Sequence, residues 1–190
     1  MTGSPASRAS YIRTSGALLA SLALLTACGS KPEALPRITG HALGGDAEAS
    51  TYTGFENAEI GEEYRFALPL PYNKSAKDLT ITGARVVHVP PGMKVMGMSA
   101  HAMADTDDAV IATARSEGDL AADALNRAKD LIDEPIEVKA KSLGDRYYVV
   151  RIKVTGPVKG DVETCHFEYR QGSRDYHQII GCHFVLKLQK

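Results

Sequence analysis

Apolar and polar residues alternate along much of the chain after residue 63. This period of two is typical of β-strands that bury one face. It is clearest where Tyr148, Val150, Ile152 and Val154 recur at every second position. The pattern therefore predicts a mainly β domain. The predicted strands cover residues 64–70, 79–89, 94–98, 136–140, 148–154, 162–170 and 176–188.

One stretch follows helical spacing instead. Between residues 116 and 133, apolar residues recur at every third or fourth position, and Pro135 follows as a stop signal. We therefore expect one amphipathic helix, at about 116–133, inserted between the strands. Short strands separated by turns are typical of two packed antiparallel sheets. The predicted fold for residues 55–190 is thus an antiparallel β-sandwich, Ig-like or cupredoxin-like, with one inserted helix.

The N-terminal part of the chain has the features of an export signal. Arg8 and Arg13 precede an apolar core at 17–25, which is too short for a permanent membrane span. The core continues into Leu25-Thr26-Ala27-Cys28, which resembles the lipobox of bacterial lipoproteins. The resemblance implies that residues 1–27 are a signal peptide and that Cys28 is lipidated. The protein is then expected on the extracytoplasmic side of the cell membrane, held there by its lipid.

Composition, net charge and the absence of catalytic motifs each exclude some classes of function. Residues 28–54 are rich in small residues and proline, which predicts a flexible tether between the lipid and the domain. Removing the leader, which holds two arginines and no acid, changes the formal net charge from −1 to −3. A chain that is near neutral and has no basic block is not expected to bind nucleic acid. No motif of a known catalytic class occurs, so we expect a protein that is not an enzyme.

The cysteines predict a disulfide. With Cys28 lipidated, Cys165 and Cys182 remain, on the two strands that flank the turn at 172–175. If the turn is centred between residues 173 and 174, Cys165 lies directly opposite Cys182, at a Cα distance that suits a disulfide. An extracytoplasmic compartment permits the bond. His166 and His183 then share the other face of the hairpin, either as solvated side chains or as a two-imidazole surface site.

Residues 88–103 hold the most unusual chemistry. Thioether and imidazole donors together favour copper, especially Cu(I). The run His101-Ala102-Met103 is similar to the His-x-Met segment of extracytoplasmic copper chaperones, which are also β-sandwiches. The other interpretation is that the methionines fill irregular gaps in the core. The candidate copper ligands are His88, Met93, Met96, Met98, His101 and Met103.

Together these features favour one function over a second. The leading hypothesis is a membrane-anchored extracytoplasmic lipoprotein that acts as a non-enzymatic binding module, without a cofactor, for an envelope protein or a small ligand. The alternative is an extracytoplasmic copper-binding protein that uses residues 88–103.

Overall fold

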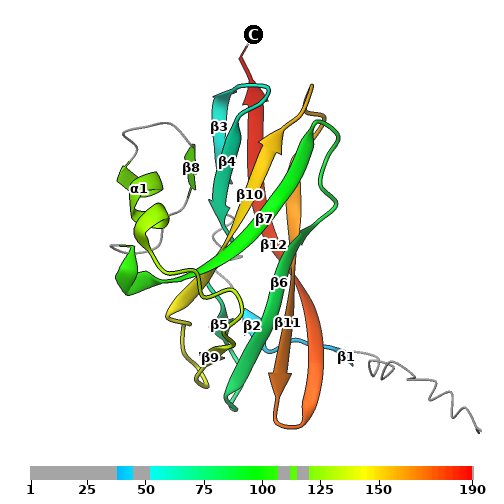
Figure 1. Ribbon diagram of the computed structural model, residues 1–190. Helices are drawn as coiled ribbons and strands as arrows, with labels where there is room; N and C mark the ends of the chain where they lie inside the picture. The colour runs from blue at the N-terminus through cyan, green and yellow to red at the C-terminus, as the bar shows by residue number, and fades with distance from the viewer. Residues whose placement is uncertain (1–37, 45–51, 107–111, 115–119, 190) are drawn as a thin grey trace, which may run out of the picture. The chain divides into compact units, whose positions relative to one another are not determined.

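The computed structural model describes residues 38–44, 52–106, 112–114 and 120–189. These residues form two larger β-sheets, one small two-stranded sheet and one short α-helix (Figure 1). The prediction of a mainly β fold is therefore confirmed. The expected leader at 1–27 and the lipidation site Cys28 lie outside the described residues.

The sheets differ in size and strand order. The larger one has the order β1-β12-β11-β6-β9, and β3 also pairs with β12. Its strands are β1 (Ile38–Thr39), β3 (Tyr52–Ala58), β6 (Leu79–Val87), β9 (Ile136–Val138), β11 (Val162–Gln171) and β12 (Arg174–Leu188). The second has the order β7-β10-β4-β8. Its strands are β4 (Glu63–Ala67), β7 (Met93–Ala102), β8 (Ala112–Ala114) and β10 (Arg146–Val154). The small sheet pairs β2 (Leu43–Gly44) with β5 (Tyr72–Asn73).

The six-stranded sheet is mixed, whereas the sequence led us to expect antiparallel pairing throughout. Strands β1 and β3 both run parallel to β12. β1 pairs with the start of β12 at Tyr176 and His177, and β3 pairs with its second half from His183 onward. Parallel pairing needs a long connection between the partners. The distance in sequence between β1 or β3 and β12 supplies it.

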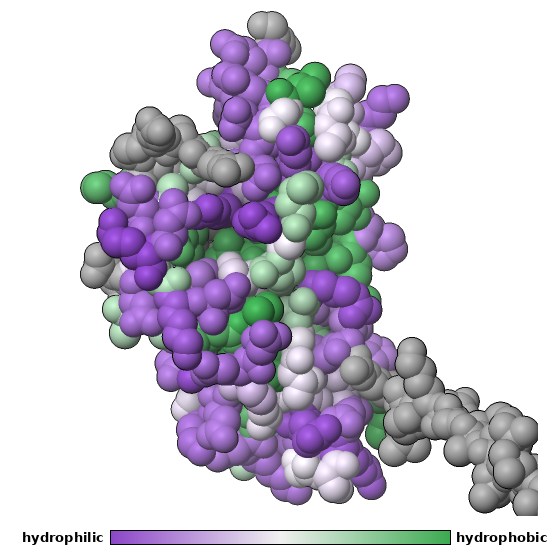
Figure 2. Space-filling view, viewed as in Figure 1, coloured by the Kyte–Doolittle hydropathy of each residue, from purple (hydrophilic) through white to green (hydrophobic). Residues whose placement is uncertain are grey.

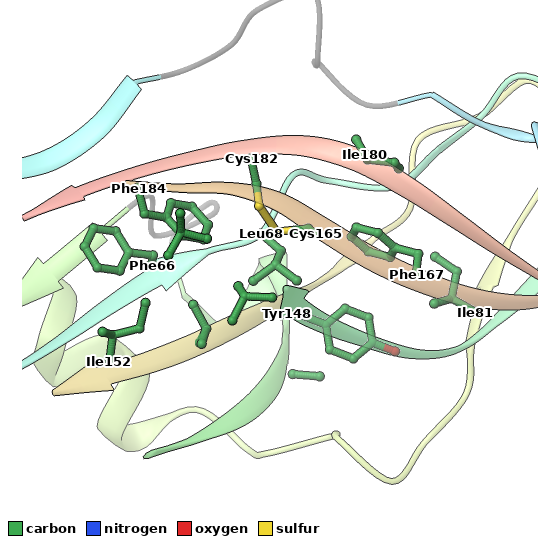
Figure 3. Close-up of a cluster of buried hydrophobic side chains, with 14 of the residues drawn as sticks. Phe66, Leu68, Ile81, Tyr148, Ile152, Cys165, Phe167, Ile180, Cys182 and Phe184 are labelled. Carbon is green, nitrogen blue, oxygen red and sulfur yellow. A yellow bond between two sulfur atoms is a disulfide. The ribbon is translucent and has the colours of Figure 1, made fainter. Parts of the chain in front are cut away.

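The inner faces of the two larger sheets pack against each other and form the main core (Figure 3). Aromatic rings make contacts from sheet to sheet: Phe66 of β4 stacks on Phe184 of β12 at a centroid distance of 4.9 Å. Tyr148 of β10 meets Phe167 of β11 edge to face at 6.3 Å. The alternating residues of β10 that predicted a strand are all buried in this core, as expected.

The helix ends earlier than predicted, and the first predicted residues, 116–119, lie outside the described residues. Helix α1 covers Leu120–Arg127, and residues 128–133 are not helical. The Asp130 carboxylate accepts hydrogen bonds from the backbone N–H groups of Ala100 and Ile132. The N–H of Leu131 donates to the carbonyl of Ala100 at 2.7 Å. These bonds attach the chain to the end of β7, so the backbone groups there are satisfied outside a helix.

The folded part also begins earlier than the predicted boundary at residue 55. Strands β1 and β2 and the start of β3 fall inside the stretch 28–54 that we expected to be a tether. Leu43 is almost fully buried, and its N–H and carbonyl both bond the side-chain amide of Gln178. The N–H of Ala42 donates to the Tyr169 hydroxyl, and a Cβ atom at Gly40 would overlap that hydroxyl. Glycine is therefore required where this segment crosses the sheet.

No helix in the described ranges combines the length and the apolar character needed to cross a bilayer.

Candidate functional site

The predicted disulfide is present between Cys165 of β11 and Cys182 of β12, with a Cα–Cα distance of 5.7 Å. It lies on the inner face of the six-stranded sheet (Figure 3). The expected hairpin register is wrong by two residues, because Cys165 faces Ile180 and the tight turn is centred between Gly172 and Ser173. Gly172 has a φ of 61°, which suits the first position of a two-residue hairpin turn.

The two cysteines are therefore diagonal neighbours, not directly opposed. A shift of two residues keeps every side chain on its original face, so both sulfur atoms still point into the core. A break in the register between Val162 and Thr164 accompanies this arrangement.

The methionines of the 88–103 stretch are distributed along β7 and do not form one cluster. Met93 is buried in the main core, and Met98 packs against that core. Met96 is the extra residue of a β-bulge opposite Arg151 and Ile152, and its side chain is 39% exposed. Met103 packs in a second, smaller core beneath helix α1. Their surroundings match the interpretation of methionine as a packing residue.

His101 is buried and already makes two hydrogen bonds. Its Nδ1 lies 3.1 Å from the carbonyl oxygen of Lys129, and its Nε2 lies 2.8 Å from the Ser99 hydroxyl. Burial lowers its pKa, and the bond to the Lys129 carbonyl partly offsets that effect. Copper binding would require His101 to give up at least one of these bonds.

His88 is exposed at the turn that leads from β6 to β7, with a φ of 56°. Met93, at the opposite end of β7 from His101, lies eight residues away from it, or roughly 27 Å along an extended strand. The copper interpretation stays a prediction, and it requires ligands that this fold keeps far apart.

Helix α1 covers half of the outer face of the four-stranded sheet. Leu125 of the helix packs on Tyr147 and Val149 of β10. The guanidinium of Arg65, on β4, donates to the Asn126 side chain at 2.8 Å and to the carbonyl of Ala122 at 3.5 Å. Arg65 thus holds the helix on this half of the sheet.

The other half of that face is basic, and we call it the basic half-face: Lys94, Arg151 and Lys153, with Glu63. Lys94 and Lys153 are directly opposed on β7 and β10. The carboxylate of Glu63 lies 3.8 Å from the Arg151 guanidinium. Directly opposed like charges destabilise a sheet.

A pocket of about 200 Å³ opens near the ends of β6 and β9. Its charged side chains are compensated: Lys139 bonds Asp78 at 3.0 Å, and Arg170 bonds Asp175 at 2.8 Å. Hydrogen bonds from the Ala140 N–H and from Lys139 lower the pKa of Asp78. Glu137, which also lines the pocket, lies 3.9 Å from the Lys139 ammonium group.

The histidines of the hairpin are paired differently from the prediction. His166 stacks on His177, with ring centroids 5.6 Å apart and planes 14° apart. The Nε2 of His183 lies instead 3.1 Å from a carboxylate oxygen of Asp161. The two-residue difference in register replaces one histidine neighbour by another.

Comparison with known proteins gives no match: no family model, no curated protein and no solved structure is significantly similar to the chain.

Proposed function

We propose that this protein is an extracytoplasmic lipoprotein, anchored through Cys28, that acts as a non-enzymatic binding module at the cell envelope. The observation that carries the proposal is the disulfide between Cys165 and Cys182, because such bonds persist in oxidising compartments outside the cytosol. It agrees with the lipobox-like run Leu25–Cys28 and with the apolar segment that precedes it.

Binding is favoured over catalysis by how the titratable groups are used. In the described part of the chain, the charged groups of the pocket are held in ion pairs. The buried imidazole of His101 is held by two hydrogen bonds. Neither arrangement provides a general acid, a general base or a nucleophile at neutral pH.

The basic half-face is the surface that best suits a partner. Arginine and methionine are enriched in protein interfaces, and Arg151 lies beside the exposed Met96 here. We therefore expect an acidic protein partner of the envelope. Lys94 and the bulge at Met96 are features that protect an edge strand from added strands. The partner is thus expected to contact side chains of the face and not to extend the sheet.

Figure 2 shows that hydrophilic side chains cover most of the face in view, with apolar patches between them.

The finer fold class is also part of the proposal. We propose that the two packed sheets belong to the Ig-like or cupredoxin-like sandwich class. The shared core between two sheets whose strands alternate apolar and polar residues supports it. In that case β1 and β3, which pair parallel to β12, are extra strands added to an antiparallel sandwich.

One experiment tests anchor and surface together. In cells fed labelled fatty acid, the parent should be labelled and should fractionate with membranes. Cys28→Ser should lose both properties, whereas the Cys165→Ala/Cys182→Ala control should keep the label. A labelled, membrane-bound Cys28→Ser protein would refute the anchor.

The second arm uses a photoactivatable cross-linker at position 96, beside the basic half-face. Arg151→Glu/Lys153→Glu should abolish the cross-linked product, and Lys139→Glu/Lys141→Glu, an equal change of charge elsewhere, should not. Equal effects of the two double variants would show that net charge matters and that this face does not.

A further inference from the structure

The outer face of the six-stranded sheet brings together three side chains of the types that bind transition metals. Glu168 of β11 and His177 of β12 are directly opposed. His166 precedes Glu168 by two residues and therefore points from the same face. Directly opposed Cβ atoms lie about 4.5–5.5 Å apart. All three side chains can thus reach toward one point above the sheet.

Their present contacts show how close they already are. The rings of His166 and His177 are stacked at 5.6 Å. The Nδ1 of His166 lies 4.0 Å from the Oε1 of Glu168. The same Oε1 lies 3.1 Å from the Arg85 guanidinium on β6, and the Nε2 of His177 lies 3.4 Å from the Thr39 hydroxyl on β1.

We propose that His166, Glu168 and His177 form a binding site for a divalent transition-metal ion, and for Zn²⁺ in particular. Two imidazoles and one carboxylate are a known protein ligand set for Zn²⁺. Three protein ligands leave a further coordination position for water or for a donor from a partner.

The site closes only when metal enters. As they stand, no three His, Cys, Asp or Glu side chains of the described residues surround a point where an ion would fit. Binding therefore includes rotation of the two imidazoles out of their stack and release of Glu168 from Arg85. The Arg85 side chain of that ion pair is 56% exposed and the Glu168 side chain 18% exposed. Because solvent screens the guanidinium, this pair is weaker than a fully buried one.

The backbone beneath these side chains needs no such change. β11 and β12 are interior strands of the sheet, flanked by β6 on one side and by β1 and β3 on the other. Cys165, next to His166, is bonded to Cys182 on the opposite face, which fixes the two strands to each other. Ligands on rigid elements lose little freedom on binding, which favours a site on these strands.

Calorimetric titration with ZnCl₂ tests the proposal. The protein is the full chain without a polyhistidine tag, carrying Cys28→Ser so that no free thiol competes. We expect one Zn²⁺ per chain. His177→Ala should weaken binding by more than the roughly 10- to 100-fold that loss of a ligand's supporting partner causes. Arg85→Ala should strengthen binding, because Glu168 is then no longer shared with the guanidinium.

The matched control is His183→Ala. This histidine is also on β12 and also pairs with a carboxylate, but it lies six residues, or about 20 Å, beyond His177. It should leave Zn²⁺ affinity unchanged. Substitution of Co²⁺ for Zn²⁺ adds a readout, since the visible absorption of bound Co²⁺ should disappear in His177→Ala and in Glu168→Gln. Circular dichroism of each variant checks that it remains folded.

Three results would overturn the proposal. The first is the absence of stoichiometric Zn²⁺ binding by the folded parent. The second is binding by folded His177→Ala with the affinity of the parent. The third is equal loss of affinity in His177→Ala and His183→Ala, which would indicate nonspecific binding to surface histidines.

Discussion

Reduction of the Cys165–Cys182 bond should destabilise the domain by about 3 kcal/mol. The bond joins residues 17 apart in sequence. The loop-closure relation for a loop of this length gives a loss of about 10 cal/mol/K of entropy in the unfolded chain, which is about 3 kcal/mol at 25 °C. Both residues are at most 6% exposed, and a thiol is a small apolar group, so the reduced side chains remain acceptable in the core. The effect is therefore expected to act mainly through the unfolded state.

Urea denaturation with and without reductant measures this effect. The chain has no tryptophan, so far-ultraviolet circular dichroism is the suitable signal. For a slope of about 2 kcal/mol/M, the midpoint should fall by about 1.5 M on reduction. The control is Cys165→Ala/Cys182→Ala, whose midpoint should not respond to reductant.

Two results would refute the reasoning. One is a pair of reactive thiols in protein that was exported and kept under non-reducing conditions. The other is an unchanged midpoint, which would mean that the hairpin is already closed in the unfolded ensemble.

Two further predictions concern single positions. His101→Ala should lower the free energy of unfolding by about 2 kcal/mol, because it removes a buried side chain and leaves two partly buried groups, the Ser99 hydroxyl and the Lys129 carbonyl, without their partner. Because burial lowers the pKa of His101 below 6.5, the unfolded chain takes up a proton at a higher pH than the folded chain does. The free energy of unfolding should therefore fall as pH decreases through 6.5. His101→Gln should reduce this pH dependence, and an unchanged pH profile in that variant would contradict the prediction. Gly54→Ala should destabilise by about 1–3 kcal/mol, because its Cβ would overlap the backbone of Val185, whereas Gly156→Ala has open space and should have little effect on the urea midpoint.

The sequence predicted those strands whose inner side chains form the core. In β10 every second residue from Tyr148 to Val154 is buried in the core. These positions are apolar because they are buried, and the sequence pattern therefore shows the strand. β1, β2 and β8 have two or three residues each, too few to show a period. Leu43 is the single large apolar residue of β2, and its burial depends on Gln178 and Tyr169, more than 100 residues away.

The end of the helix was also not predictable from the local sequence pattern. Apolar spacing continued to residue 132, so the pattern predicted a helix through that point. In the structure Leu131 is buried in the main core, whereas Leu125 packs in the smaller core beneath α1. Two apolar residues can share helical spacing and yet be buried in different places. Hydrogen bonds of the 130–132 segment to the end of β7 decided between these outcomes.

Register explains why the disulfide was predictable and the histidine group was not. Whether Cys165 and Cys182 share a face depends only on whether the positions are even or odd, and a slip of two residues leaves that unchanged. Which histidine lies beside His166 depends on the register itself. The slip moved His183 away from His166 and brought His177 next to it. The register followed from where the Gly172-Ser173 turn closes, and glycine at its first position is the local signal that would have located it. Functional sites assembled across strands therefore require the turn to be placed to the residue, whereas a core disulfide requires only the correct face.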